Sequence, residues 1–152
     1  MTELIRLQTQ QENDTCVSAC LGMLLGIDHQ QIVKEFHDKY QNHETDAGEF
    51  LENAGLVPRY HYTRENLCDL LVDRVYLLVV PSRNIEGGHH QIVAHTLLSE
   101  DNQLVWRIYD PCEGREGKKY YTGTETQFSW VAELSVSVRE LLSWRVLNES
   151  GE

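Results

Sequence analysis

The sequence predicts an α+β fold in which a helical N-terminal half packs against an antiparallel sheet formed by the second half. Three observations indicate this fold. Apolar residues recur with helical spacing in the first half, short apolar runs typical of strands begin at residue 75, and turn residues separate two of these runs. The 152 residues contain no repeat and no Pro-rich linker, so we expect a single domain over residues 1–152.

The first predicted helix begins after Asp14 or Thr15, either of which can cap its N-terminus, and it ends at Gly26. Cys16 therefore lies in the first turn of this helix. The apolar spacing along the helix is formed by Val17, Cys20, Leu21, Leu24 and Leu25.

Three further segments of the first half have helical spacing. One runs roughly from His29 to Tyr40, and the next begins near Asp46 and ends at Gly55. A fourth helix is expected over residues 65–73 because the segment ENLCDLLVD has the same kind of pattern.

The sequence pattern of the second half predicts β-strands. The wholly apolar run at 75–80 is typical of a strand that is buried on both faces. Residues 90–97 and 103–110 form two more predicted strands, joined by the turn residues 99–102. Residues 118–122 can add another strand, and the pattern of 135–147 fits a strand or a helix.

Charge and hydropathy exclude two classes of partner. The chain carries 24 acidic against 13 basic residues, a formal net charge of −11, which argues against binding nucleic acid. No apolar run approaches the roughly 18 to 20 residues of a membrane span. The polar N-terminal residues lack the pattern of a signal peptide, so we expect a cytoplasmic protein. Its cysteines are then expected to be free thiols, metal ligands or a nucleophile; they are Cys16, Cys20, Cys68 and Cys112.

Cys16 is the best candidate for a nucleophile. A thiol that transfers acyl groups needs an environment that favours the thiolate, a base that moves protons, and donors for the developing oxyanion. The unpaired N–H groups and the dipole at the start of the first helix favour a thiolate at Cys16. Cys20, one turn further along, is expected to point into the core.

The base is one of several histidines near the first strand of the predicted hairpin. A turn centred near residues 100–102 places Asp110 opposite residues 90–94, whereas His95 lies too far along the strand. A carboxylate at Asp110 can accept the N–H of an imidazole at His90 and fix its tautomer. His89 stays an alternative, because a register shift of one residue exchanges the two faces of the strand.

The segment QQENDTCVSACLGMLLG, residues 10–26, resembles the nucleophile segment of the bacteriocin-processing, double-glycine leader peptidases, a papain-like cysteine peptidase family. Both have a Gln six residues before the Cys, and Ala-Cys-Leu three to five residues after it. A helix, an apolar strand ending at Pro81, a His that opens a hydrophobic strand and an Asp-Pro pair at 110–111 then follow in the family's order. The resemblance covers roughly residues 8–115.

The resemblance implies a papain-like fold, here as a free-standing domain, and a role for each site residue. Cys16 is the nucleophile, His90 the base and then the acid, Asp110 orients the imidazole, and Gln10 donates to the oxyanion together with the backbone N–H of Cys16. The chain departs from the family at three positions: Thr15, where the family usually has an acidic residue, Val17, where it usually has Gly, and Gln91, where it usually has an aromatic residue after its His.

The sequence therefore predicts a cysteine hydrolase that cleaves a peptide or isopeptide bond without a cofactor or a metal, with deamidation or transglutamination as related chemistry. Its acidic character favours a basic peptide or protein substrate. One alternative is a catalytically inactive papain-like binding module or inhibitor. Another is a zinc site, whose thiolate and imidazole ligands would be Cys16, Cys20, Cys112 and either His89 or His90.

Overall fold

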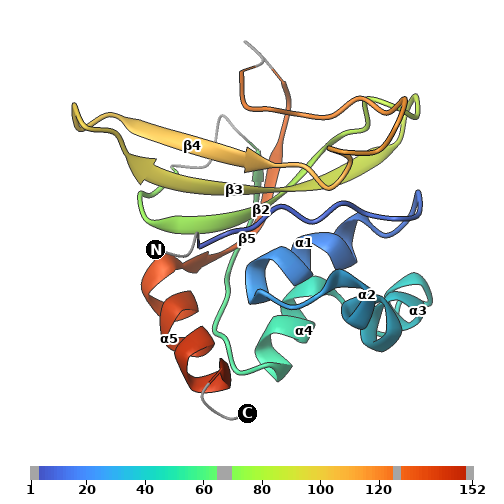
Figure 1. Cartoon of the computed structure of the whole chain (residues 1–152), viewed down its shortest axis with the longest axis horizontal. Helices are drawn as coiled ribbons and strands as arrows, with labels where there is room; N and C mark the ends of the chain where they lie inside the picture. Colours follow the sequence, from blue (N-terminus) through green and yellow to red (C-terminus); the bar gives the residue numbers. More distant parts are fainter. Residues whose placement is uncertain (1–3, 65–69, 125–127, 150–152) are drawn as a thin grey trace.

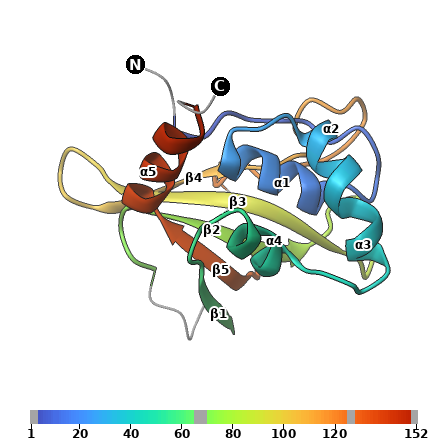
Figure 2. The same ribbon diagram turned by 90° about the horizontal axis from the view of Figure 1, so that it is seen from below.

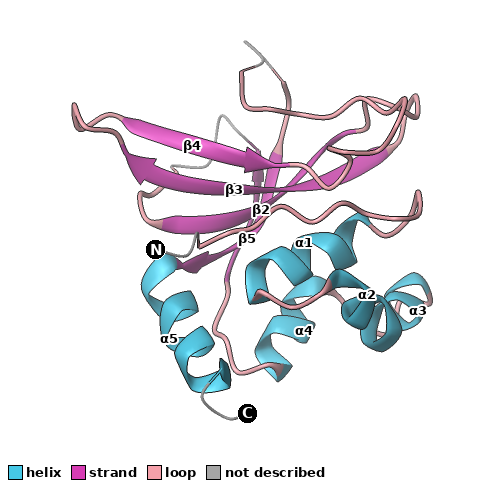
Figure 3. Cartoon of the chain, in the orientation of Figure 1, coloured by secondary structure: helices cyan, strands magenta, loops and turns pink. Residues whose placement is uncertain are grey.

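The structure, a computed structural model, describes residues 4–64, 70–124 and 128–149. It has two layers, because all the labelled helices lie on one face of a single sheet (Figure 1). In Figure 3 the helices and the strands separate into these two layers. The α+β class that the sequence predicts is therefore confirmed.

The helices follow the order that the sequence predicts in the first half, with one more at the C-terminus. They are α1 (Cys16–Leu25), α2 (His29–Ile32), the π-helical turn η1 (Val33–His37), α3 (Asp38–Gln41), α4 (Ala47–Asn53) and α5 (Val138–Glu149). None of the helices in the described ranges combines the length and the apolar character that crossing a membrane requires.

Helix α1 is the central helix of its layer, and every residue after Cys16 is buried. It ends at Gly26, which has a left-handed backbone (φ 70°) and whose N–H bonds the carbonyl of Gly22, as a C-terminal glycine cap requires. Thr15 occupies the N-cap position, but its hydroxyl donates to the Glu12 carbonyl at 3.2 Å and caps no helical N–H. The helix that presents Cys16 is thus held within the core.

The next two predicted helices are confirmed. The segment predicted from His29 to Tyr40 runs through α2, η1 and α3 without a break in helical structure, and the Asp28 side chain caps it by accepting from Gln30 N at 2.8 Å. Asp46 caps α4 in the same way.

The fourth predicted helix is wrong in the part that the structure describes. Residues 65–69, which include Cys68, lie outside the described residues, and 70–73 are not helical. Here the backbone is tied to the sheet, because Leu71 N donates to the Tyr76 hydroxyl at 2.8 Å and Leu71 O accepts from Thr96 at 2.5 Å. These contacts replace the hydrogen bonds that a helix would make.

The sheet contains five antiparallel strands in the order β1-β5-β2-β3-β4. In Figure 2 the helical layer lies in front of this sheet. The strands are β1 (Arg59–Arg64), β2 (Arg74–Pro81), β3 (His89–Leu98), β4 (Leu104–Tyr109) and β5 (Val131–Ser137).

The predicted hairpin between β3 and β4 is confirmed together with its register. Val93 pairs with Tyr109 and Leu98 with Leu104, so Asp110 follows the last paired residue of β4. The segment 135–147, for which the sequence allowed a strand or a helix, contains the end of a strand and most of a helix, because β5 ends at Ser137 and α5 starts at Val138. Residues 118–122 are not a strand.

Two apolar clusters explain why the central strands are buried on both faces. On β2, Val75 and Leu77 pack against the helices, while Tyr76, Leu78 and Val80 pack in a second cluster with Trp130. The C-terminal helix α5 also supports α1. Its Arg145 guanidinium donates to the carbonyls of Met23 and Leu24, which lie in the last turn of α1. The apolar packing against β2 and the hydrogen bonds from Arg145 together fix the position of α1 above the sheet.

Candidate active site

Cys16 and His90 line one pocket of about 380 Å³ between the helices and the sheet. Cys16 is half-buried at the first position of α1, and His90 is the second residue of β3. The structure thus brings together the nucleophile and the base that the sequence predicts. The complete lining is Cys16, Val17, Tyr40, Val79, His89, His90, Gln91 and Glu133.

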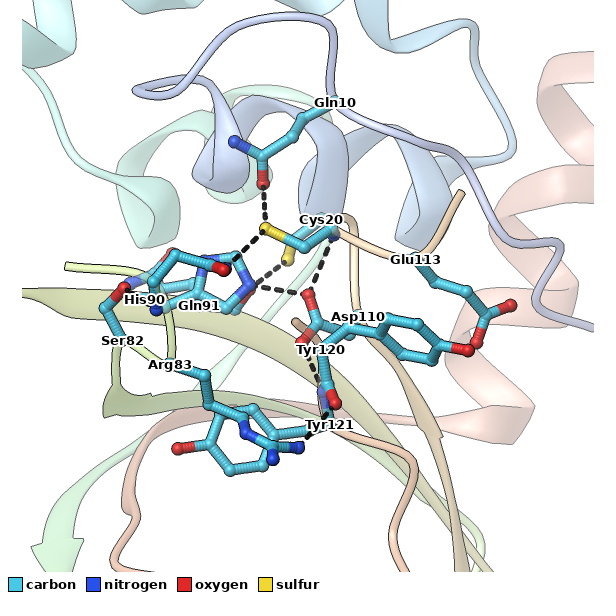
Figure 4. Close-up of polar contacts among 12 residues, drawn as sticks. Gln10, Cys20, Ser82, Arg83, His90, Gln91, Asp110, Glu113, Tyr120 and Tyr121 are labelled. Carbon is cyan, nitrogen blue, oxygen red and sulfur yellow. Dashed lines mark hydrogen bonds and ion pairs between the residues drawn. The ribbon is translucent and has the colours of Figure 1, made fainter. Parts of the chain in front are cut away.

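His90 and Asp110 form a buried pair, with 2.6 Å between His90 Nε2 and Asp110 Oδ1. Figure 4 shows the two side chains pointing toward each other. The same carboxylate accepts from Cys112 N at 2.8 Å and, through Oδ2, from Tyr121 N at 2.7 Å. Because backbone groups fix Asp110, its bond to Nε2 fixes the imidazole and leaves Nδ1 available for a second partner.

The surroundings of His90 favour its protonated form. Burial by itself lowers the pKa of His90, but hydrogen bonds to Asp110, Cys112 and Cys16, together with the charge of Asp110, raise that pKa well above its ordinary value of 6.5. At neutral pH this raised pKa favours the imidazolium form of the ring beside the Cys16 thiol. A cation in this position favours the thiolate form of a cysteine.

His89, the alternative base, does not share the contact with Asp110. Its side chain is exposed at the start of β3, although it lines the same pocket. The carboxylate that can orient an imidazole is therefore bonded to His90.

Cys20 has a structural environment, as the sequence predicts. It is fully buried and donates to the Gln91 carbonyl at 3.4 Å. Burial, and to a smaller extent the nearby Cys16, raises the pKa of the Cys20 thiol well above 9.0. Cys20 is consequently a neutral thiol that packs beneath the site.

Gln10 is buried beside the cluster rather than in the lining of the pocket. Its backbone N–H donates to Pro111 O at 2.9 Å, and its side-chain Nε2 donates to Glu12 O at 2.6 Å. Its Oε1 accepts from the Cys112 thiol at 3.7 Å, and Figure 4 shows Gln10 approaching from the N-terminal segment. One amide hydrogen already has an acceptor, so its role as an oxyanion donor stays a prediction.

The four-residue zinc set that the sequence suggests is not assembled. Among the described residues, the ligand atoms of His90, Asp110 and Cys112 lie within 4.8 Å of one another, but Cys16 and Cys20 do not belong to this group. The bond between His90 and Asp110 already uses the facing ligand atoms. The three described cysteines, Cys16, Cys20 and Cys112, are free thiols.

Two features of the site were missed by the sequence analysis. Glu133 of β5 lines the pocket and accepts from Gln91 Nε2 at 2.9 Å. Tyr121 supplies the second backbone donor to Asp110, from a segment that the sequence only suggests as a strand. Neither contact has a local sequence signal, because each joins residues that are distant in the chain.

Comparison of the chain with protein-family models, with curated proteins and with solved structures found no match. The resemblance to papain-like peptidases therefore depends on the motif around Cys16 and on the order of the residues that follow it.

Proposed function

We propose that the protein is a papain-like cysteine hydrolase that cleaves a peptide bond in a peptide or protein. The observation that carries this proposal is the shared pocket of Cys16 and His90, with His90 bonded at 2.6 Å to the buried Asp110. A helix that presents the cysteine above an antiparallel sheet supports the papain-like assignment.

In the first half of the reaction, the Cys16 thiolate attacks the carbonyl carbon of the scissile bond. The carbonyl oxygen becomes an oxyanion, which N–H groups at the start of α1 stabilise, including that of Cys16. The imidazolium of His90 then gives its proton from Nδ1 to the leaving nitrogen, and the C–N bond breaks. The products are a free amine and a thioester on Cys16.

In the second half, His90 is neutral because it has given up its proton, and it now acts as a base. It takes a proton from water, the resulting hydroxide attacks the thioester carbonyl, and the C–S bond breaks. A carboxylic acid leaves and the Cys16–His90 pair is restored. Asp110 is a positioning residue here, because it keeps Nε2 occupied and directs Nδ1 toward the thiol.

Digestion of a peptide library tests this proposal. Purified protein is incubated with peptides from a digested proteome, and new peptide ends are identified by mass spectrometry. We expect the wild type to produce a defined set of new ends, the Cys16→Ser variant to produce none, and Cys112→Ser to preserve the wild-type pattern.

Two results would contradict the proposal. Cleavage that survives Cys16→Ser but disappears with Cys112→Ser would assign the chemistry to the other thiol of the cluster. Peptides that are retained by the wild type and never cut would favour the inactive binding module instead.

A further inference from the structure

The carboxylate of Glu133 lines the pocket beside Cys16 without a cationic partner. It is half-buried, and its Oε1 accepts from Gln91 Nε2 at 2.9 Å. Within residues 4–64, 70–124 and 128–149, no lysine, arginine or histidine forms an ion pair with it. An acid that is partly removed from water is ordinarily paired with a cation, so its isolation needs an explanation.

A β-bulge directs Glu133 toward the pocket. Leu77 of β2 pairs with Leu134 of β5, but the next residue, Leu78, pairs with Ala132, so Glu133 is the extra residue. Ala132 packs on the far side of the sheet and Leu134 on the helical side. The inserted residue therefore changes which face the strand presents, as bulges next to active sites do.

The side-chain oxygen of Gln91 is a hydrogen-bond acceptor that receives no hydrogen bond from the described residues. This residue is only 7% exposed, and its Oε1 has no hydrogen-bond partner in the described part of the chain. A buried amide oxygen in this state loses its hydrogen bond to water without a replacement. Gln91 and Glu133 contact each other, and both residues line the pocket that Cys16 also lines.

The other walls of the pocket suit the stem of a long side chain. Val17 of α1 and Val79 of β2 supply apolar surface, and the ring of Tyr40 stands on the helical side. Lysine and arginine place their methylene groups against such surfaces while the charged end reaches an acid. The lining of the pocket, about 380 Å³, contains no lysine or arginine, and its basic residues are His89 and His90.

We propose that this pocket, the Glu133 pocket, binds a lysine or arginine side chain of the substrate next to the bond that Cys16 attacks. The inference rests on the proposed function, because only an attack by Cys16 places the pocket beside the scissile bond. Glu133 is the residue that determines specificity, and Gln91 holds its carboxylate.

The environment of Glu133 agrees with a site that receives a cation. Burial, and then the charge of Asp46, raise the pKa of Glu133 above its ordinary value of 4.5, while the hydrogen bond from Gln91 lowers it. These surroundings therefore destabilise the ionised carboxylate. An ammonium or guanidinium group would reverse this effect by direct pairing.

Peptidyl acyloxymethyl ketones, which alkylate an activated cysteine, test the proposal. Probes carry lysine, norleucine or glutamate at the first or the second residue before the ketone, and mass spectrometry follows the labelling of Cys16. Norleucine resembles lysine without its ammonium group. In one of the two series we expect the lysine probe to label at least about 10-fold faster than norleucine, because a charge-assisted hydrogen bond is gained.

The variant Glu133→Gln should bring the lysine-to-norleucine ratio close to one, because the amide has no charge to pair with the ammonium group. Glu100→Gln is the matched control, since Glu100 is an exposed acid at the turn between β3 and β4, and it should keep the full ratio. Equal labelling by lysine and norleucine in both wild-type series would overturn the Glu133 pocket while leaving the activated Cys16 intact. A Glu133→Gln variant that slows all probes equally would also overturn it. Failure of every probe to label Cys16 would overturn the proposed function itself.

Discussion

Replacing His90 with Gln is expected to slow the alkylation of Cys16 by iodoacetamide about 100-fold at about pH 6. In the wild type, the raised pKa of His90 favours an imidazolium beside Cys16, and a cation in that position favours the thiolate form of a cysteine. Without that cation, an ordinary cysteine with a pKa of about 8.5 is only about 0.3% ionised at this pH. The rates are measured by quenching aliquots of native protein and quantifying each cysteine by peptide mass mapping.

His89→Gln is the matched control for this measurement. His89 is adjacent in sequence and lines the same pocket, but its side chain is exposed and the Asp110 contact belongs to His90. We expect it to change the rate by less than about 3-fold, a small effect beside the loss of the imidazolium. A large loss with His89→Gln and none with His90→Gln would reverse the assignment of the base.

Replacing Asp110 with Asn is expected to lower the free energy of unfolding by about 2 to 4 kcal/mol at neutral pH. The buried carboxylate accepts from two backbone N–H groups and from His90. An amide at this position must direct its NH₂ toward at least one of these donors. The imidazole would also lose the partner that orients it.

The effect of Asp110→Asn should depend on pH with a definite sign. The folded-state pKa of His90 is raised, so the stability that this proton contributes is fully present below the unfolded value of about 6.5 and is lost as pH rises toward the folded pKa. The difference between wild type and variant should therefore shrink above about pH 6.5. Urea unfolding at several pH values measures it. A difference that stays constant or grows across this range would show that Asp110 does not hold His90 as a cation.

The parts of the fold that were predictable are those determined by local pattern. The apolar spacing from Val17 to Leu25 and the glycine at 26 define α1, since an enclosed helix must be apolar on nearly all sides. The β3–β4 register follows from the turn residues between two alternating runs. That register was sufficient to connect Asp110 with the histidines at the start of β3.

The parts that were not predictable depend on tertiary contacts. Strand β1 has the sequence RYHYTR, in which Tyr60 and Tyr62 are exposed and a register shift separates Tyr60 from Thr63. An edge strand of this kind lacks the apolar alternation that identifies a strand. Residues 70–72 have apolar side chains without being helical, because Tyr76 and Thr96 bond the backbone of Leu71.

Some residues of the candidate site could be predicted from the local sequence pattern and others could not. Cys16, His90 and Asp110 were found because each stands at the end of a predictable element. Glu133 was not found because only a bulge in β5 turns it toward the pocket, and a bulge has no signature in the isolated strand sequence. The position of Glu133 in the pocket therefore follows from the three-dimensional structure and not from the sequence pattern.

We propose that His90 holds Cys16 as a thiolate, and the ultraviolet absorbance of thiolates tests this without any reagent or substrate. The spectrum of Cys16→Ser is subtracted from that of the wild type across a pH titration. We predict that one thiolate is already present at about pH 6 and that His90→Gln removes it. A thiolate signal that develops only around the ordinary cysteine pKa of about 8.5, with or without His90, would contradict the account.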